Sequence, residues 1–167
     1  MTKVIAEIGI NFGGNISIAK DLILQASKSG CWGVKFQFRD SENFYYSDNE
    51  IGDAIVRNEI LKNHLSFVQI SHLQEYSNSL GLKFGMSFFR VNDLKQYLDN
   101  IKDPDFYKVP SAEATNIMLI DSLLERDKLL IISSGGHFID DILNLLVDCK
   151  YKKIVIMHCI ANYPADL

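Results

Sequence analysis

Short apolar segments rich in β-branched and aromatic residues alternate along the chain with longer segments in which apolar residues recur at helical spacing. The first pattern is typical of buried strands and the second of amphipathic helices, so their alternation predicts repeated βα units around a parallel sheet. Six strands are expected, at Val4–Ile10, Gly33–Phe38, Lys83–Phe89, Phe106–Val109, Leu129–Ser134 and Lys153–Ile160.

Helices are expected between the strands, from the spacing of their apolar residues. Their apolar faces cover residues 18–26, 65–76, 94–101, 119–124 and 139–146. The segment 40–63 is the one long insertion, and it is polar and aromatic. Long loops that follow strands are where such sheets bind ligands, so the insertion is expected beside the functional site.

The order of the elements distinguishes two α/β architectures. The turn after the first strand, GINFGGN, lacks the glycine spacing of a dinucleotide-binding fold. The pattern therefore favours a TIM-type (β/α) barrel, which has eight strands and about 250 residues when complete. The sequence has 167 residues. We expect one domain over residues 1–167, an incomplete or truncated barrel with about six of the eight βα units.

Composition and charge narrow the classes of function. Hydrophobic residues make up 47% of the chain and charged residues 23%, which fits a soluble globular domain. The formal net charge is −4 and the basic residues are scattered, which argues against nucleic-acid binding. The longest apolar runs are too short to cross a membrane, and the N-terminus has no signal-peptide pattern. We expect a cytoplasmic protein that binds neither nucleic acid nor membrane.

The cysteines give no sign of a covalent or metal framework. Cys31, Cys149 and Cys159 are odd in number and widely spaced. This arrangement indicates neither a disulfide framework nor a zinc-binding pair, so we expect buried, reduced thiols.

Polar side chains interrupt the apolar strands near their ends. Both faces of a strand in such a sheet are buried, so a charged residue there is costly unless it is paired or used. Alternation places Glu7 of the first strand, and Lys35 and Gln37 of the second, on the face that lines the mouth of the barrel. We expect a Lys–Glu contact between these neighbouring strands.

The segment KVPSAEATN, residues 108–116, carries polar groups at a strand end. Lys108 differs in parity from Ser111 and Glu113, so strict alternation cannot direct all three at one ligand. Pro110 is expected to end the strand and turn Ser111 into the loop, with residue 115 or 116 capping the next helix. The fifth strand similarly ends in IISSGG, where Ser133 and the following amides are expected to form a phosphate cradle.

Five motifs occur in an order and at a spacing that resemble the sialic acid synthase family, the bacterial N-acetylneuraminate synthases and their legionaminate and pseudaminate relatives. They are IAEIGIN, VKFQ, KVPSAEATN, IISSGG and HCIANYP. The resemblance runs from Val4 to Pro164. It implies condensation of phosphoenolpyruvate with the open-chain aldehyde of an N-acetylated amino sugar such as N-acetylmannosamine, with release of phosphate.

The resemblance also implies roles for individual residues. Phosphoenolpyruvate is expected to bind Lys35, Ser87, Lys108, Ser111 and Ser133. The sugar is expected to bind Glu7, Gln37 and Tyr163. The catalytic residues are expected to be Glu7, Lys35 and Glu113.

Departures from the family pattern bear on the substrate. Phe12 stands where the family commonly has a polar residue near the sugar site, Phe88 replaces a threonine, and Ala161 replaces a polar side chain. The resemblance implies a divalent metal, manganese or magnesium, and a homodimer. In the family two histidine ligands follow the sixth strand and an antifreeze-like domain lies at the C-terminus, so we expect no metal ligands and no such domain in this chain.

The histidines in the sequence are assigned other places. His158 is expected to support the core or to form a hydrogen bond within the barrel. Surface positions are expected for His64, His72 and His137.

These observations leave two alternatives to the synthase. The chain could be a degenerate, non-catalytic anion-binding barrel protein, or an unrelated aldolase-type barrel enzyme. Within the synthase interpretation, the 167 residues are expected to be an N-terminal fragment that is not competent alone.

Overall fold

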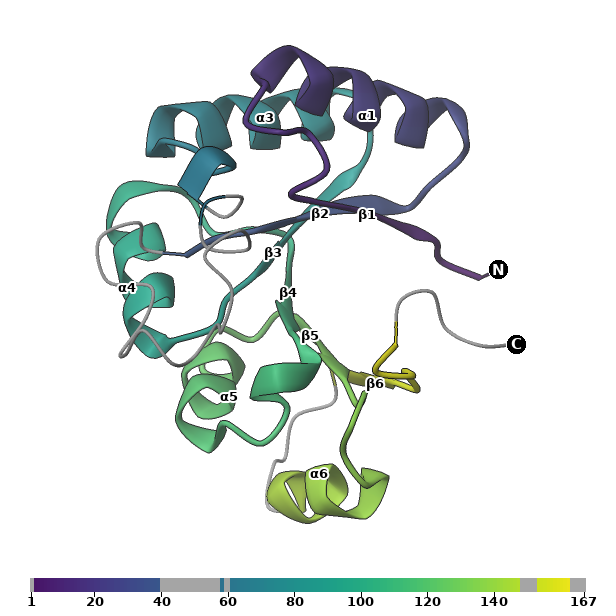
Figure 1. Cartoon of the computed structure of the whole chain (residues 1–167), viewed down its shortest axis with the longest axis vertical. Coiled ribbons are helices and arrows are strands. Elements are labelled where there is room, and N and C mark those ends of the chain that lie inside the picture. Colours follow the sequence, from purple (N-terminus) through teal and green to yellow (C-terminus); the bar gives the residue numbers. More distant parts are fainter. Residues whose placement is uncertain (1, 40–57, 59–60, 148–152, 163–167) are drawn as a thin grey trace.

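Six parallel strands form the centre of the computed structural model, which describes residues 2–39, 58, 61–147 and 153–162 (Figure 1). They are β1 (Ile5–Gly9), β2 (Gly33–Gln37), β3 (Lys83–Ser87), β4 (Phe106–Val109), β5 (Leu129–Ser133) and β6 (Ile154–Met157). Each strand pairs with the next one along the chain, so the spatial order is the order in the sequence. The α/β class and the six strands predicted from the sequence are confirmed.

Helices cover the outer side of the curved sheet (Figure 1). They are α1 (Ile16–Lys28), α3 (Phe67–Ser79), α4 (Val91–Asn100), α5 (Ile117–Leu124) and α6 (Ile139–Leu146). Within the described ranges, β1 and β6 each have a single neighbouring strand. Figure 1 shows the sheet open between these two edges, so closure into a barrel stays a prediction.

Polar side chains cap the starts of α1, α3 and α5, whereas α4 and α6 have no side-chain cap. Asn15 accepts hydrogen bonds from two backbone N–H groups of α1. Ser66 and Gln69 form a capping box at the start of α3. Asn116 accepts from the backbone of Leu119 at 3.2 Å and caps α5, as the sequence predicted. Each cap satisfies N–H groups that have no partner within the helix.

Several strands are shorter than the sequence predicted. The ladder between β2 and β3 ends where Gln37 pairs with Ser87, and that between β5 and β6 ends where Ser133 pairs with Met157. The apolar residues beyond these pairs lie in loops. The end of β4 is confirmed, because Pro110 follows the strand and opens the 3-10 turn η1 (Ser111–Glu113).

Aromatic rings fill the core between the sheet and α4. The ring centroids of Phe88 and Tyr97 are 5.2 Å apart, and Phe38 lies 5.7 Å from Tyr97. Phe12 is also buried and packs against Phe36 at 5.9 Å. The apolar side chain that replaces the family's common polar residue at this position therefore belongs to the core under the helices.

No helix within the described part of the chain is long and apolar enough to cross a membrane.

Replacing Phe88 by Ala tests the aromatic core. The fully buried ring leaves a cavity on removal, so the free energy of unfolding should fall by about 3–5 kcal/mol. Phe138 is 81% exposed, so Phe138→Ala should change the free energy of unfolding by less than about 0.5 kcal/mol. Urea unfolding followed by circular dichroism measures both. Equal losses in the two variants would contradict the described core.

Candidate active site

An apolar floor closes the inner side of the sheet. The buried Phe106 ring lies over two glycines of the neighbouring strands, and a Cβ at Gly85 would overlap it. A Cβ at Gly33 would lie 3.2 Å from the same ring. The Trp32 ring packs beside Phe106 with centroids 5.3 Å apart. Glycine at both positions therefore makes room for one large ring beneath the polar residues.

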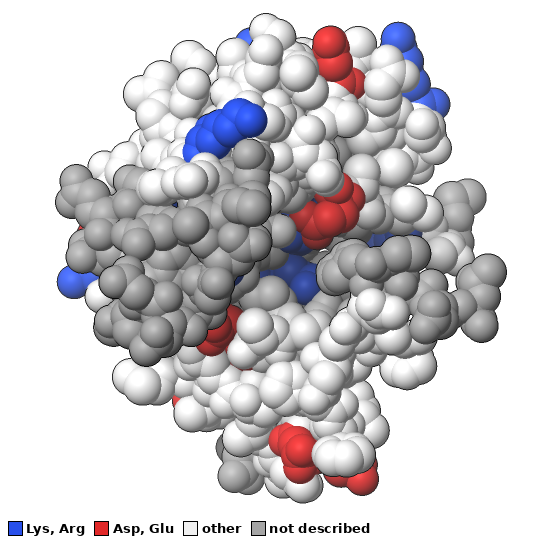
Figure 2. Space-filling model, in the orientation of Figure 1, with Lys and Arg blue, Asp and Glu red and all other residues white. Residues whose placement is uncertain are grey.

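A cavity of about 630 Å³ opens above this floor, at the C-terminal ends of the strands. Figure 2 shows basic and acidic side chains side by side in the central hollow of the molecular surface. The site residues predicted from the sequence that line the cavity are Glu7, Lys35, Gln37, Ser87, Lys108, Ser111 and Ser133. The convergence of these side chains at one rim is therefore present in the structure.

Lys35 is held by three acceptors. Its Nζ donates to Ser87 Oγ at 2.6 Å and to the Phe36 carbonyl at 3.4 Å, and it forms an ion pair with Glu7 Oε2 at 2.8 Å. An ammonium has three N–H donors, so this group is fully engaged. Burial lowers the pKa of Lys35, and the Glu7 carboxylate opposes that shift. The predicted Lys–Glu contact is confirmed.

A bulge in β1 positions Glu7. The register pairs Glu7 with Lys35 and then Gly9 with Phe36, so one residue of β1 is left unpaired. Gly9 has φ 54°, and a Cβ there would lie 3.0 Å from Glu7 Oε1 and 3.4 Å from Gln37 Nε2. The glycine thus leaves room for both polar side chains. Strict strand alternation did not predict this bulge.

Lys108 is the second cation of the cavity and has fewer partners. It pairs in register with Ser87, and its Nζ donates to the Val109 carbonyl at 3.2 Å. Across the described ranges no carboxylate lies within ion-pair distance of it. Burial and the nearby charge of Lys35 lower the pKa of Lys108 to about 8, although Glu7 and Cys159 act in the opposite direction.

Hydroxyl groups join the loops that follow β4 and β5. Ser111 Oγ accepts from the Gly135 N–H at 3.1 Å, and His137 Nε2 lies 2.8 Å from the Ser111 carbonyl. Ser133 Oγ accepts from Cys159 Sγ at 3.3 Å. The amide of Gly135, expected to help hold phosphate, is therefore used within the protein.

Three residues outside the predicted site set depart from their expected places. His137 is half-buried and connects two loops, whereas a surface position was expected. His158 is exposed directly after β6, so it does not support the core. Cys159 lines the cavity and is half-buried, and parity with Met157 on β6 could have identified it. Cys149 lies outside the described residues.

Of the predicted site residues that the structure describes, Glu113 is not among those that line the cavity. Glu113 Oε2 accepts a hydrogen bond from Asn116 Nδ2 at 2.8 Å, so its carboxylate is held at the start of α5. Tyr163 lies outside the described residues. Their roles stay predictions.

The described side chains do not form a metal centre. No group of three or more His, Cys, Asp or Glu residues within that part of the chain is arranged to hold a metal ion. The carboxylate of Glu7 and the thiol of Cys159 face a cavity that also contains two lysines, which is a donor set unsuited to a divalent cation.

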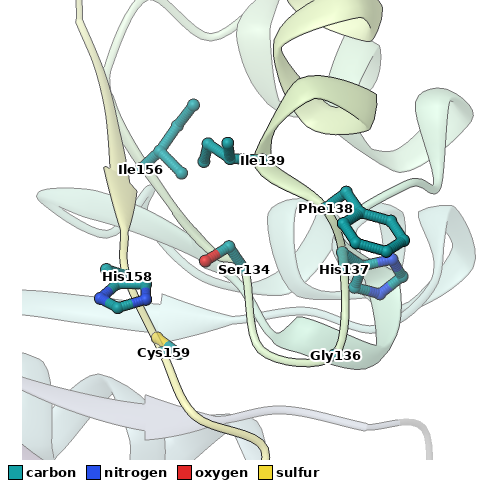
Figure 3. Close-up of a pocket in the computed structure, with 8 residues that line it drawn as sticks. All are labelled: Ser134, Gly136, His137, Phe138, Ile139, Ile156, His158 and Cys159. Atoms are coloured by element: carbon teal, nitrogen blue, oxygen red, sulfur yellow. The ribbon is translucent and has the colours of Figure 1, made fainter.

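A second cavity, of about 560 Å³, lies between β6 and α6 (Figure 3). Ile156 and Ile139 point toward one another across it, while His137 and Phe138 lie on the loop that leads into α6. This cavity lacks the cations of the first one. The first cavity is therefore the candidate active site.

A double-mutant cycle tests the ion pair. Glu7→Gln leaves the buried Lys35 ammonium without its anion and should lower the free energy of unfolding by roughly 1–3 kcal/mol. Lys35→Met removes the buried charge, so Glu7→Gln should cost almost nothing in that background. Urea unfolding at pH 7 measures the coupling, and additive losses would contradict the pair.

The pKa of Lys108 predicts a pH dependence of stability. Its folded pKa is about 8 and its ordinary value is 10.5, so between these values the unfolded chain binds more protons at this residue. Stability should therefore rise with pH through this window by an amount that Lys108→Met lacks. The comparison is the free energy of unfolding of the two proteins at pH 7 and pH 9.5. Parallel pH profiles would contradict the assignment.

Comparison with known proteins identifies the family of the chain. The family model described as "NeuB family" matches residues 22–167. An N,N'-diacetyllegionaminic acid synthase of Legionella pneumophila is 29% identical over 98% of this chain and 50% of its own length. An N-acetylneuraminate-9-phosphate synthase of Drosophila melanogaster is 29% identical over 98% of this chain and 46% of its own.

Solved structures show the same fold. The N-acetylneuraminic acid synthetase of Leptospira borgpetersenii, solved with citrate, superposes with a TM-score of 0.83 at 23% identity, over 98% of this chain and 55% of that chain. The chain thus spans about half the length of the curated relatives it matches. From the family match over most of its length, this chain belongs to the NeuB family.

Proposed function

We propose that the chain binds phosphoenolpyruvate in the cavity of about 630 Å³, as part of a synthase that condenses it with an N-acetylated amino sugar such as N-acetylmannosamine. The products are a nonulosonic acid and inorganic phosphate. One observation carries the proposal: two lysines and three serine hydroxyls face a single cavity in a family whose named relatives are synthases of such acids.

The charges of the cavity suit an anion with two acidic groups. Phosphoenolpyruvate carries a phosphate and a carboxylate. Lys35 is already balanced by Glu7, whereas Lys108 has no carboxylate partner within the described ranges. A charge-assisted hydrogen bond contributes about 1.5–3 kcal/mol, more than a neutral one. Lys108 is thus the stronger candidate for holding the phosphate, with Ser111 and Ser133 as hydroxyl donors on the same side.

The opposite side of the cavity is assigned to the sugar. Glu7 of β1 and Gln37, the last residue of β2, line the cavity, and their side chains can form hydrogen bonds with hydroxyl groups. In the proposed reaction the enol carbon attacks the sugar aldehyde and forms a C–C bond. Water then adds to the resulting cation, and phosphate leaves by C–O cleavage. A catalytic role for Glu113 in this proposal requires its carboxylate to leave Asn116.

The remaining expectations concern the whole protein. We propose that the open sheet belongs to a closed TIM-type barrel and that the protein is a homodimer. The resemblance implies manganese or magnesium, but the described residues do not fit a metal centre, so no step is assigned to a metal. Binding of phosphoenolpyruvate is the property that the described residues support. Membership of the NeuB family excludes the alternative of an unrelated aldolase-type barrel.

Isothermal titration calorimetry with phosphoenolpyruvate tests the binding. Lys108→Ala should weaken affinity about 10- to 100-fold, because a charged hydrogen bond to phosphate is lost. Lys83→Ala is the matched control, since Lys83 lies at the opposite end of β3 and pairs with Asp105 at 3.2 Å. Circular dichroism checks that both variants fold. Equal affinities of the two variants would remove Lys108 from the site.

Turnover separates the synthase from a non-catalytic binding protein. The assay measures phosphate released from phosphoenolpyruvate in the presence of manganese and N-acetylmannosamine. Release that depends on the sugar supports the synthase. Tight binding without release, in a protein of the relatives' full length, supports the anion-binding alternative.

A further inference from the structure

We propose that Lys108 is a carbonyl-reactive amine that forms a Schiff base with small 2-keto acids entering the cavity, pyruvate being the simplest. This reaction goes beyond the proposed condensation, which needs no covalent bond between protein and substrate. It makes the cavity a covalent modification site as well as a binding site. The proposal stands on the arrangement of the two lysines, and the covalent adduct can be detected without enzyme turnover.

The two lysines differ in how many partners their Nζ atoms have. All three donors of Lys35 are engaged, by Glu7, Ser87 and a backbone carbonyl. An ammonium held in this way has no free lone pair with which its nitrogen could attack a carbonyl carbon. Lys108 Nζ makes one hydrogen bond, to the Val109 carbonyl. The rest of that amine faces the cavity, where a carbonyl carbon can approach it.

The surroundings of Lys108 favour the neutral amine, which is the nucleophile. Lysines become nucleophilic at neutral pH when they are desolvated or lie next to another cation. Lys108 meets both conditions, because it is partly buried and Lys35 lies nearby. Its pKa of about 8 leaves a substantial neutral fraction at pH 8, whereas an exposed lysine is almost wholly protonated there.

The same cavity selects a carbonyl compound that carries an acid group. The Ser87 and Ser133 hydroxyls face the same cavity as Lys108, beside the Lys35–Glu7 ion pair. A carboxylate adjacent to the reacting carbonyl can accept hydrogen bonds from these hydroxyls while the carbonyl meets Lys108. A 2-keto acid has this geometry, and a simple ketone does not.

The chemical step balances without an added co-reactant. The amine nitrogen of Lys108 attacks the keto carbon and forms a carbinolamine. The two hydrogens of the neutral amine leave with the carbonyl oxygen as water, and a C=N bond forms. Cyanoborohydride then delivers hydride to the imine carbon, which traps a stable secondary amine for detection.

Reductive trapping of pyruvate tests the proposal. The chain is incubated with pyruvate and cyanoborohydride at several pH values, digested, and analysed by peptide mass spectrometry. Lys108 should gain one carboxyethyl group at least tenfold faster than the exposed Lys83 and Lys153, with half-maximal labelling near pH 8. Lys108→Arg keeps the positive charge and should lose this adduct. The α-amino group, whose ordinary pKa is also near 8, should label equally in both proteins.

Control reactions test why Lys108 is labelled. Acetone, which has no carboxylate, should label Lys108 at the rate of the surface lysines. Cys159→Ala should leave the Lys108 adduct unchanged, which rules out transfer from the neighbouring thiol. Labelling of Lys108 no faster than Lys83, or an adduct on Lys35 instead, would overturn the proposal. Calorimetry with phosphoenolpyruvate is independent of this readout, so failure of either proposal is distinguishable from failure of the other.

Discussion

A buried ammonium inside a parallel sheet is the constraint on which the site depends. Lys35 is almost fully buried, and an isolated charge in such surroundings is strongly disfavoured. Glu7 on β1 and Ser87 on β3 surround it, so the three strands are joined through one polar group. The pair also sets the electric field at Lys108, because Lys35 lowers and Glu7 raises the pKa of that second lysine.

Strand geometry made much of the site predictable from the sequence. Alternation within β1 and β2 directs Glu7, Lys35 and Gln37 to one face, because successive side chains of a strand point to opposite sides. The opposite face is apolar and lies under the helices, where Phe36 is buried. Pro110 ended β4 for a reason that is also local, since it lacks the N–H that a ladder requires.

What the sequence did not predict depends on contacts between distant segments. The bulge in β1 interrupts alternation between Glu7 and Gly9, and no local pattern in the sequence indicated it. The bond between His137 and the Ser111 carbonyl joins two loops that are separated by a helix and a strand. The bond from Asn116 to Glu113 competes with any role of that carboxylate in the cavity. Such pairings become visible only when the loops are placed in space.

The Phe106 ring that covers Gly33 and Gly85 is not among the described residues that line the cavity. The polar lining comes from the C-terminal parts of the strands and the loops that follow them, whereas the ring fills space next to two glycines. A smaller residue at position 106 would therefore leave a void beside these glycines, which larger residues at positions 33 and 85 could fill. Packing at this level of the sheet can thus change while the lysines and serines of the cavity keep their places.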